Sequence, residues 1–229
     1  MVTDAKIRRT YAHGPTGIVQ AGHREYVGGL WDEVGLLQFR FLREAGLRRD
    51  HRLLDIGCGS LRAGVHLIAY LDAGGYMGVD KEPDLIRLGI ERELDTEVYE
   101  AKRPVLMVLT DFEFDRLPVA PDIAWANSVF THLPPDAIRL CLTNLRSVIA
   151  PGGVLYATFA ECDEPTDNPT EPHDHRLFEY TRRQMTEAGH ATGWRVEHLG
   201  KWGHPRGQRM LRFTPTPSHN PSRRTTHES

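Results

Sequence analysis

The sequence predicts an α/β fold in which a mostly parallel β-sheet is covered by helices on both faces. Short apolar runs alternate with amphipathic helical patterns from residue 30 to residue 199. Parallel strands need crossover connections, which are usually helices, and a parallel sheet buries both of its faces. The last two apolar runs, at 194–199 and 209–213, are separated only by a turn rich in glycine and proline. One of these two strands must therefore run antiparallel to its neighbours.

The individual elements follow from the spacing of apolar residues. The first predicted helix places Leu30, Val34, Leu37 and Phe41 on one face and ends near Gly46. Apolar runs bounded by glycine, proline or polar residues predict strands at 52–57, 76–80, 105–109, 123–126, 154–159, 194–199 and 209–213. Helical spacing predicts further helices at 61–71, 83–93, 135–150 and 181–188.

Composition excludes several classes of protein. The chain has 229 residues, 40% of them hydrophobic and 26% charged, which excludes a fully disordered chain. Its 28 basic and 31 acidic residues give a net charge of −3 with no basic field, so we expect no nucleic-acid or membrane partner. No apolar run is long enough to span a bilayer and no secretory signal is evident. Three cysteines without paired spacing favour reduced thiols, so we expect a cytoplasmic protein.

Polar, glycine-rich and proline-rich segments set the expected boundaries. Residues 1–24 are expected to form a flexible N-terminal arm, residues 25–213 the folded domain, and residues 214–229 a disordered tail. The segment 161–174 carries six carboxylates and three prolines, and it is too long for an ordinary connection. A connection of this kind is either a functional lid or a disordered loop, and both interpretations stay open.

The most informative motif runs from Leu53 to Ser60, with the sequence LLDIGCGS. It is a strand that enters a Gly-X-Gly turn and then a helix, which allows a ligand to approach the backbone and the N–H groups of the helix start. A Walker loop is excluded because no Gly-Lys-Ser/Thr follows. A dinucleotide-binding fingerprint would need a third glycine where Arg62 stands.

Two acidic residues follow the next two predicted strands. Asp80 ends the second strand, 23 residues after Gly57, where an acid accepts hydrogen bonds from the ribose of an adenosine-containing ligand. The alternative role for Asp80 is to cap the helix that starts at Pro83. Asp111 follows the third strand, where a carboxylate can accept a hydrogen bond from an adenine amino group, although a surface loop also carries such acids.

These three features, in this order, resemble the class I S-adenosylmethionine-dependent methyltransferases. The segments 122–135 (DIAWANSVFTHLPP) and 145–156 (LRSVIAPGGVLY) resemble the fourth and fifth strand motifs of that family. The resemblance covers about residues 52–159. It implies a Rossmann-like, doubly wound sheet of seven strands in the order 3-2-1-4-5-7-6, with strand 7 antiparallel. One departure is that Ser60 and Leu61 replace the end of the common glycine pattern, and Ser60 can cap the next helix instead.

The resemblance implies S-adenosylmethionine as the cofactor. It also implies a set of cofactor-binding residues: Asp55, Gly57, Cys58, Gly59, Arg62, Asp80, Lys81, Asp111, Phe112, Asn127 and Ser128. In this set Asp55 accepts a hydrogen bond from the cofactor's amino group. Gly57 and Gly59 flank its methionine tail, and Arg62 faces its carboxylate. Asp80 holds the ribose, Lys81, Asp111 and Phe112 surround the adenine, and Asn127 and Ser128 lie beneath the sulfonium.

The acceptor side offers several candidates. His132 follows the fourth strand, where a base would border the transferred methyl group, but it can also simply satisfy the turn before Pro134. His173 and His175 in the candidate lid are further candidates, although such a pair on an acidic loop is often only solvated. Tyr26 and Trp31 are candidate cover aromatics, with core packing as the alternative for Trp31. No metal site is expected, because the histidines are scattered.

The sequence thus predicts an S-adenosylmethionine-dependent methyltransferase of a small-molecule or metabolite acceptor, with oxygen favoured slightly over nitrogen. Two alternatives stay open. One is a peptide or protein methyltransferase, which an open acidic groove would favour. The other is a catalytically silent protein that binds the cofactor without turnover. The sequence does not predict the oligomeric state.

Overall fold

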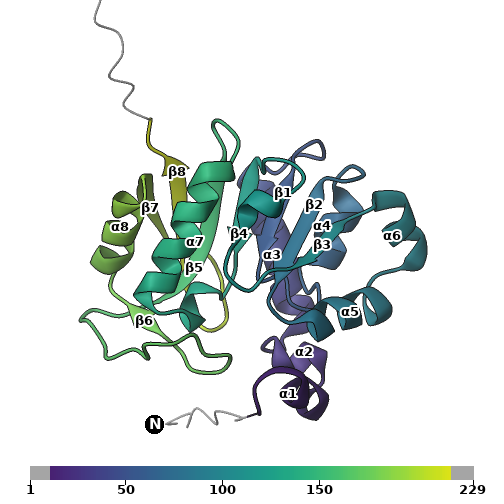
Figure 1. Ribbon diagram of the computed structural model, residues 1–229, viewed down its shortest axis with the longest axis horizontal. Coiled ribbons are helices and arrows are strands. Elements are labelled where there is room, and N and C mark those ends of the chain that lie inside the picture. Colours follow the sequence, from purple (N-terminus) through teal and green to yellow (C-terminus); the bar gives the residue numbers. More distant parts are fainter. Residues whose placement is uncertain (1–10, 218–229) are drawn as a thin grey trace, which may run out of the picture.

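A computed structural model describes residues 11–217 of the chain, and Figure 1 shows its arrangement. The main sheet has the strand order β3-β2-β1-β4-β5-β8-β7, and a short strand, β6, pairs with the end of β5. Strands β1 to β5 run parallel to one another, whereas β8 runs antiparallel to both β5 and β7. The predicted order and the predicted antiparallel strand are therefore confirmed.

The strands lie close to their predicted positions. They are β1 (Leu53–Ile56), β2 (Tyr76–Asp80), β3 (Val105–Val108), β4 (Ile123–Ala126), β5 (Val154–Glu161), β6 (Glu179–Tyr180), β7 (Trp194–Lys201) and β8 (Arg209–Pro215). The central strands β1 and β4 are buried along their whole length, as expected of parallel strands covered on both faces. In the register, Asp55 pairs with Gly78 of β2 and with Trp125 of β4, so the Gly-X-Gly turn that follows β1 opens between these two strands.

The helices and 3₁₀ turns are α1 (Gly14–Ala21), α2 (His23–Tyr26), α3 (Trp31–Glu44), α4 (Gly64–Tyr70), α5 (Pro83–Arg92), α6 (Thr96–Lys102), η1 (Phe114–Arg116), η2 (Phe130–His132), α7 (Pro135–Val148) and α8 (Arg182–Ala191). Prolines at the starts of α5 and α7 suit positions that have no intrahelical N–H partner. A capping box of Thr181 and Gln184 fixes the start of α8.

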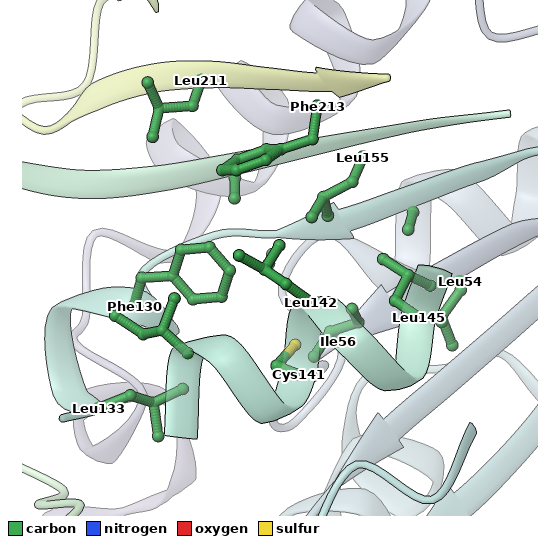
Figure 2. Close-up of a cluster of buried hydrophobic side chains, with 14 of the residues drawn as sticks. Leu54, Ile56, Phe130, Leu133, Cys141, Leu142, Leu145, Leu155, Leu211 and Phe213 are labelled. Atoms are coloured by element: carbon green, nitrogen blue, oxygen red, sulfur yellow. The ribbon is translucent and has the colours of Figure 1, made fainter. Parts of the chain in front are cut away.

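Two apolar cores stabilise the sheet, one on each face. Helices α7 and α8 cover the first core, in which Cys141, Leu142 and Leu145 of α7 meet Leu155 of β5 and Phe213 of β8 (Figure 2). Helices α3, α4 and α5 contribute to the second core on the opposite face. A fully buried aliphatic or aromatic side chain stabilises the fold by about 1.5–3 kcal/mol. The two cores therefore hold the carboxyl ends of the strands in fixed positions.

Several segments differ from the sequence predictions. Residues 14–21 form helix α1 where a loose arm was predicted, because Gly17 packs closely against Tyr26 and Ile18 is buried. Helix α6, capped by Asp95, was not predicted. Ser60 does not cap α4, whose N-cap is Ala63, and its hydroxyl instead donates to the His23 carbonyl.

At the C-terminal end, residues 214 and 215 continue β8, although the predicted tail begins at 214. The remaining parts of the predicted arm and tail, 1–10 and 218–229, lie outside the described residues. Within residues 11–217, none of the helices is long and apolar enough to cross a membrane. The three cysteines, all in this range, form no disulfide.

Candidate cofactor and acceptor site

A pocket of about 600 Å³ lies at the carboxyl ends of β1, β2 and β4. In parallel α/β sheets this edge is where ligands bind. All eleven residues that the sequence predicted to bind the cofactor line this one pocket: Asp55, Gly57, Cys58, Gly59, Arg62, Asp80, Lys81, Asp111, Phe112, Asn127 and Ser128. Two further segments complete its wall, namely residues 11–29, which we call the N-terminal cover, and the β5–β6 connection, residues 162–178.

The glycine turn and Asp80 form one hydrogen-bonded unit. Gly57 and Gly59 have φ angles of +70° and +54°, which glycine adopts without strain. The Gly59 N–H donates to Oδ2 of Asp80 at 2.8 Å, and the Glu82 N–H donates to Oδ1 at 2.9 Å. Asp80 therefore fixes the turn and the entry to α5, although the N-cap of that helix is Glu82. A Cβ at position 59 would lie 2.9 Å from Val27, so this position requires glycine.

Asp55 is a buried acid on the floor of the pocket. Its Oδ2 accepts a hydrogen bond of 2.7 Å from the Tyr76 hydroxyl. Burial and, to a smaller extent, the nearby charge of Asp80 raise the pKa of Asp55 to about 7, although the Tyr76 bond opposes this shift. A cationic ligand group next to Asp55 would stabilise its charged form.

Arg62 joins the glycine turn to the N-terminal cover. Its Nη1 donates to the carbonyls of Val27 at 3.1 Å and Gly29 at 3.0 Å. Burial lowers the pKa of Arg62 to about 10, and the positive charge of Arg206 adds to this effect. The Nε–H is buried and has no hydrogen-bond partner among the described residues. Arg62 thus retains a donor for an anionic ligand group.

The turn after β4 is held by a network that the sequence did not predict. Ser128 adopts φ +61°, a strained conformation for a residue with a side chain. Its N–H donates to Oγ1 of Thr158 at 2.7 Å, and its hydroxyl contacts the Gln208 amide. The Thr158 hydroxyl donates to Gln208 Oε1 at 2.7 Å. The side-chain oxygen of the preceding residue, Asn127, is buried without a partner in residues 11–217 and borders the pocket.

The opposite end of the pocket is apolar. Phe112 adopts φ +59° after β3, and the Asn144 amide donates to its carbonyl at 3.0 Å. Apolar side chains from η1, α7 and the residues just after β3 and η2 line this end: Leu109, Phe114, Leu133, Ala137 and Leu140. Asp111 lies at the edge of the same region. A flat aromatic ring with a polar edge fits this combination of walls.

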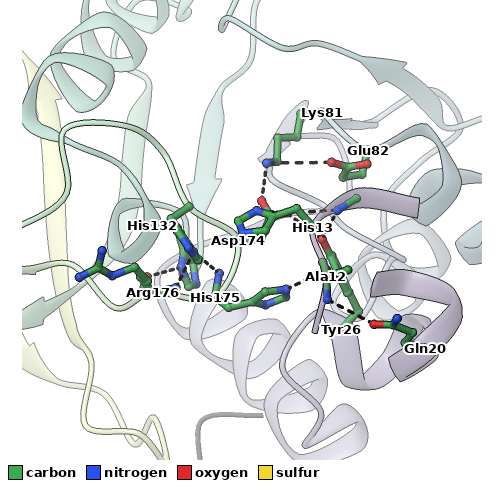
Figure 3. Close-up of polar contacts among 12 residues, drawn as sticks. Ala12, His13, Gln20, Tyr26, Lys81, Glu82, His132, Asp174, His175 and Arg176 are labelled. Carbon is green, nitrogen blue, oxygen red and sulfur yellow. Dashed lines mark hydrogen bonds and ion pairs between the residues drawn. The ribbon is translucent and has the colours of Figure 1, made fainter. Parts of the chain in front are cut away.

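The cover and the β5–β6 connection meet at Asp174 (Figure 3). Its Oδ2 accepts from the Tyr26 hydroxyl at 2.8 Å and from the Gly14 N–H at 3.4 Å, and Nδ1 of His13 lies 3.3 Å away. Its Oδ1 accepts from the Lys81 ammonium. Although burial opposes ionisation, the bonds from Lys81 and Tyr26 lower the pKa of Asp174 to about 2. Sequence reasoning missed Asp174, because it selected the two histidines beside it.

The predicted acceptor residues have different positions. His132, His173 and Tyr26 line the pocket, whereas His175 and Trp31 do not. The His175 ring lies edge-on to Tyr26, with ring centres 5.1 Å apart, so it packs behind the pocket wall. Trp31 packs under the Arg24 guanidinium at 4.9 Å. The catalytic or binding role of each residue stays a prediction.

Residues 11–217 contain no group of three or more histidine, cysteine or acidic side chains placed to hold a metal ion. The histidines that do meet, His13, His173 and His175, contact one another through their rings.

Comparisons with known proteins agree with this geometry. Residues 54–155 match the model of a family described as "Methyltransferase domain". A curated relative, trans-aconitate 2-methyltransferase of Rhizobium leguminosarum bv. trifolii, is 28% identical over 161 residues. The match covers 70% of this chain but 53% of the relative, so this chain spans about half the length of that protein.

Solved structures share the fold. Magnesium protoporphyrin IX methyltransferase from Synechocystis PCC 6803, solved with bound S-adenosylmethionine, has a TM-score of 0.54 at 17% identity, covering 91% of this chain and 89% of its own. The glycopeptide N-methyltransferase MtfA has a TM-score of 0.63 at 13% identity, covering 82% of this chain and 92% of its own. At these identities the likeness shows the fold alone.

Proposed function

We propose that this protein, whose residues 54–155 match a family of methyltransferase domains, is a class I S-adenosylmethionine-dependent methyltransferase that transfers the cofactor's methyl group to an acceptor of metabolite size. The observation that carries the proposal is the convergence of all eleven predicted cofactor residues on one pocket. Motifs that are up to 73 positions apart in the sequence, from Asp55 to Ser128, meet there.

The pocket's polar groups fit the cofactor. Asp55 would face the amino group, and the free Nε–H of Arg62 would face the carboxylate. Each carboxylate oxygen of Asp80 accepts one backbone N–H and can accept a second hydrogen bond, which a ribose hydroxyl would donate. The side-chain oxygen of Asn127 lacks a donor in the described structure, as expected of a group that a ligand satisfies.

The protein's contribution to such a reaction is positioning and exclusion of water. When bound, the cofactor supplies an activated methyl group on a sulfonium. Tyr26 and Val27 of the cover and Pro172–Asp174 of the β5–β6 connection form part of the pocket wall. A wall that orients the acceptor and removes competing water lowers the barrier of a displacement reaction.

An oxygen acceptor is favoured over nitrogen by His132. A hydroxyl gains from a base that takes its proton, and burial lowers the pKa of His132, so the ring is neutral at neutral pH. A small acceptor is supported by the trans-aconitate of the curated relative's name.

Titration calorimetry with S-adenosylmethionine and its demethylated product, followed by incubation with methyl-labelled cofactor and a metabolite extract, tests the proposal. We expect binding with one site per chain and label in a small-molecule fraction. Label in a protein fraction would instead support a peptide acceptor. Binding without transfer to any fraction would support a silent cofactor-binding protein, and the absence of binding would refute the cofactor assignment.

A further inference from the structure

The β5–β6 connection is hydrogen-bonded to η2, the turn that carries His132. The His173 N–H donates to the His132 carbonyl at 3.0 Å, and the Phe178 N–H donates to the Thr131 carbonyl at 2.8 Å. Between these two backbone bonds, Nδ1 of the His132 ring lies 2.9 Å from the carbonyl oxygen of Arg176 (Figure 3). The connection thus holds both the backbone and the ring of His132.

The ring contact identifies the proton on His132. A carbonyl oxygen can only accept a hydrogen bond, so Nδ1 must carry the proton. In a neutral imidazole the other nitrogen, Nε2, then has a free lone pair. His132 also lines the pocket, so a proton acceptor stands at the pocket wall.

We propose that the Arg176 carbonyl locks His132 in the Nδ1–H form, so that closure of the β5–β6 connection prepares Nε2 as the base for a hydroxyl acceptor. This inference rests on the proposed methyl transfer. In the step, the acceptor's O–H bond breaks, its electron pair stays on the oxygen, and the proton binds Nε2. The resulting imidazolium keeps its Nδ1–H on the Arg176 carbonyl. His132 is the catalytic residue, and the connection positions it.

The groups around His132 are consistent with a neutral ring. Burial lowers its pKa, and the nearby His175 acts in the same direction. The hydrogen bonds that the ring donates to the Arg176 and His173 backbone, together with the charge of Asp174, oppose this shift but do not overcome it. Without the Arg176 carbonyl, a neutral ring would divide its proton between the two nitrogens. The contact therefore raises the share of molecules in which Nε2 can act as a base.

Two-bond ¹H–¹⁵N spectra of the protein labelled at histidine nitrogens measure the tautomer directly, without acceptor or turnover. The signals that disappear in His132→Asn identify His132. We expect a neutral ring protonated at Nδ1 at pH 7.5. A ring protonated at Nε2, or an imidazolium at this pH, would overturn the inference. Because no acceptor is present, this result is independent of whether the proposed methyl transfer is correct.

A pair of variants separates the two nitrogens of the ring. In His132→Asn, the side-chain amide replaces the Nδ1–H donor but provides no base in place of Nε2. In His132→Ala, both the donor and the base are lost. We expect turnover to fall about 10²–10⁴-fold in both His132→Asn and His132→Ala. Amide hydrogen exchange at His173 and Phe178 should be near the wild-type rate in the Asn variant and about two- to tenfold faster in the Ala variant. Equal exchange in all three proteins, or full turnover in the Asn variant, would overturn the inference.

Discussion

At Asp55, one buried carboxyl carries both a stability cost and a binding role. Its pKa in the folded protein, about 7, lies above the ordinary value of 3.8. Between these two values the folded chain binds more protons than the unfolded chain, so the free energy of unfolding falls as the pH rises through this window. Above pH 7 the full cost is present unless a cation lies beside the carboxylate.

Asp55→Asn is therefore expected to stabilise the cofactor-free protein and to weaken cofactor binding. The Asn side chain cannot ionise, so the free energy of unfolding at pH 8 should rise by about 1–3 kcal/mol relative to the wild type. At pH 5, part-way through the window between the two pKa values, the difference between the two proteins should be smaller. Cofactor affinity at pH 8 should fall about tenfold or more. Thermal unfolding at both pH values and calorimetry measure this, and a variant that is less stable than wild type at pH 8 would contradict it.

Asp80 differs from Asp55 because it already accepts two backbone hydrogen bonds. Asp80→Asn places an NH₂ group where an acceptor is needed, against the N–H of Gly59 or Glu82. We expect cofactor affinity to fall at least about tenfold, together with a loss of about 1–3 kcal/mol in stability. Asp84→Asn on the exposed side of α5, where the acid pairs with Arg87, is the matched control and should change neither quantity much. Unchanged cofactor affinity in Asp80→Asn would remove this residue from the site.

At the scale of elements, the N-terminal cover and the β5–β6 connection are joined through the side chain of Tyr26. Its hydroxyl donates to Asp174 at 2.8 Å and accepts from the Gly14 N–H at 2.9 Å. Burial and the bond to Asp174 raise the pKa of Tyr26, so its proton stays in place at physiological pH. The same Asp174 accepts from Lys81, so three segments meet at one carboxylate.

Tyr26→Phe removes this link and keeps the ring. A hydrogen bond to a charged group contributes about 1.5–3 kcal/mol, so proteolytic cleavage within residues 162–178 should become about tenfold faster or more. Tyr99→Phe, on exposed helix α6, is the control and should leave the cleavage rate unchanged. The cofactor's product together with an acceptor should slow cleavage in the wild type. Equal cleavage of wild type and Tyr26→Phe would show that this bond does not hold the connection closed.

The elements also show which features the sequence predicts and which it cannot. Strands β2 and β4 match their predicted bounds, because their apolar runs are bounded sharply by polar residues and glycine. Helix α1 was missed because its GPTGIVQA sequence has two glycines and little amphipathic pattern, and its stability comes from packing on Tyr26. Gln208 contacts the pocket residue Ser128, 80 positions away, and Asp174 contacts Tyr26, 148 positions away, and no local pattern reports such contacts.

At the scale of the whole molecule, the chain consists of a sheet domain and a cover that is attached mainly by polar contacts. Neither apolar core contains a residue from the cover. The Glu93 carboxylate pairs with His23 and Arg24, while Arg206 donates to the Gly28 carbonyl at 2.5 Å. The cover lies at one end of the molecule, next to α5 (Figure 1). The domain should therefore fold without the cover.

Removal of residues 1–29 tests this division, since the shortened chain begins at Leu30, the residue before α3. We expect it to keep the circular dichroism of the α/β domain and to unfold cooperatively, with a loss of only about 1–3 kcal/mol, because both apolar cores remain. Cofactor affinity should fall about tenfold or more, because the pocket loses Tyr26 and Val27 and because Arg62 loses both of its carbonyl partners and becomes exposed to water. Removal of residues 218–229 is the control and should leave affinity unchanged. If the shortened chain fails to fold, the cover is part of the folding unit. If it folds and binds the cofactor with wild-type affinity, the cover is not a wall of the cofactor site.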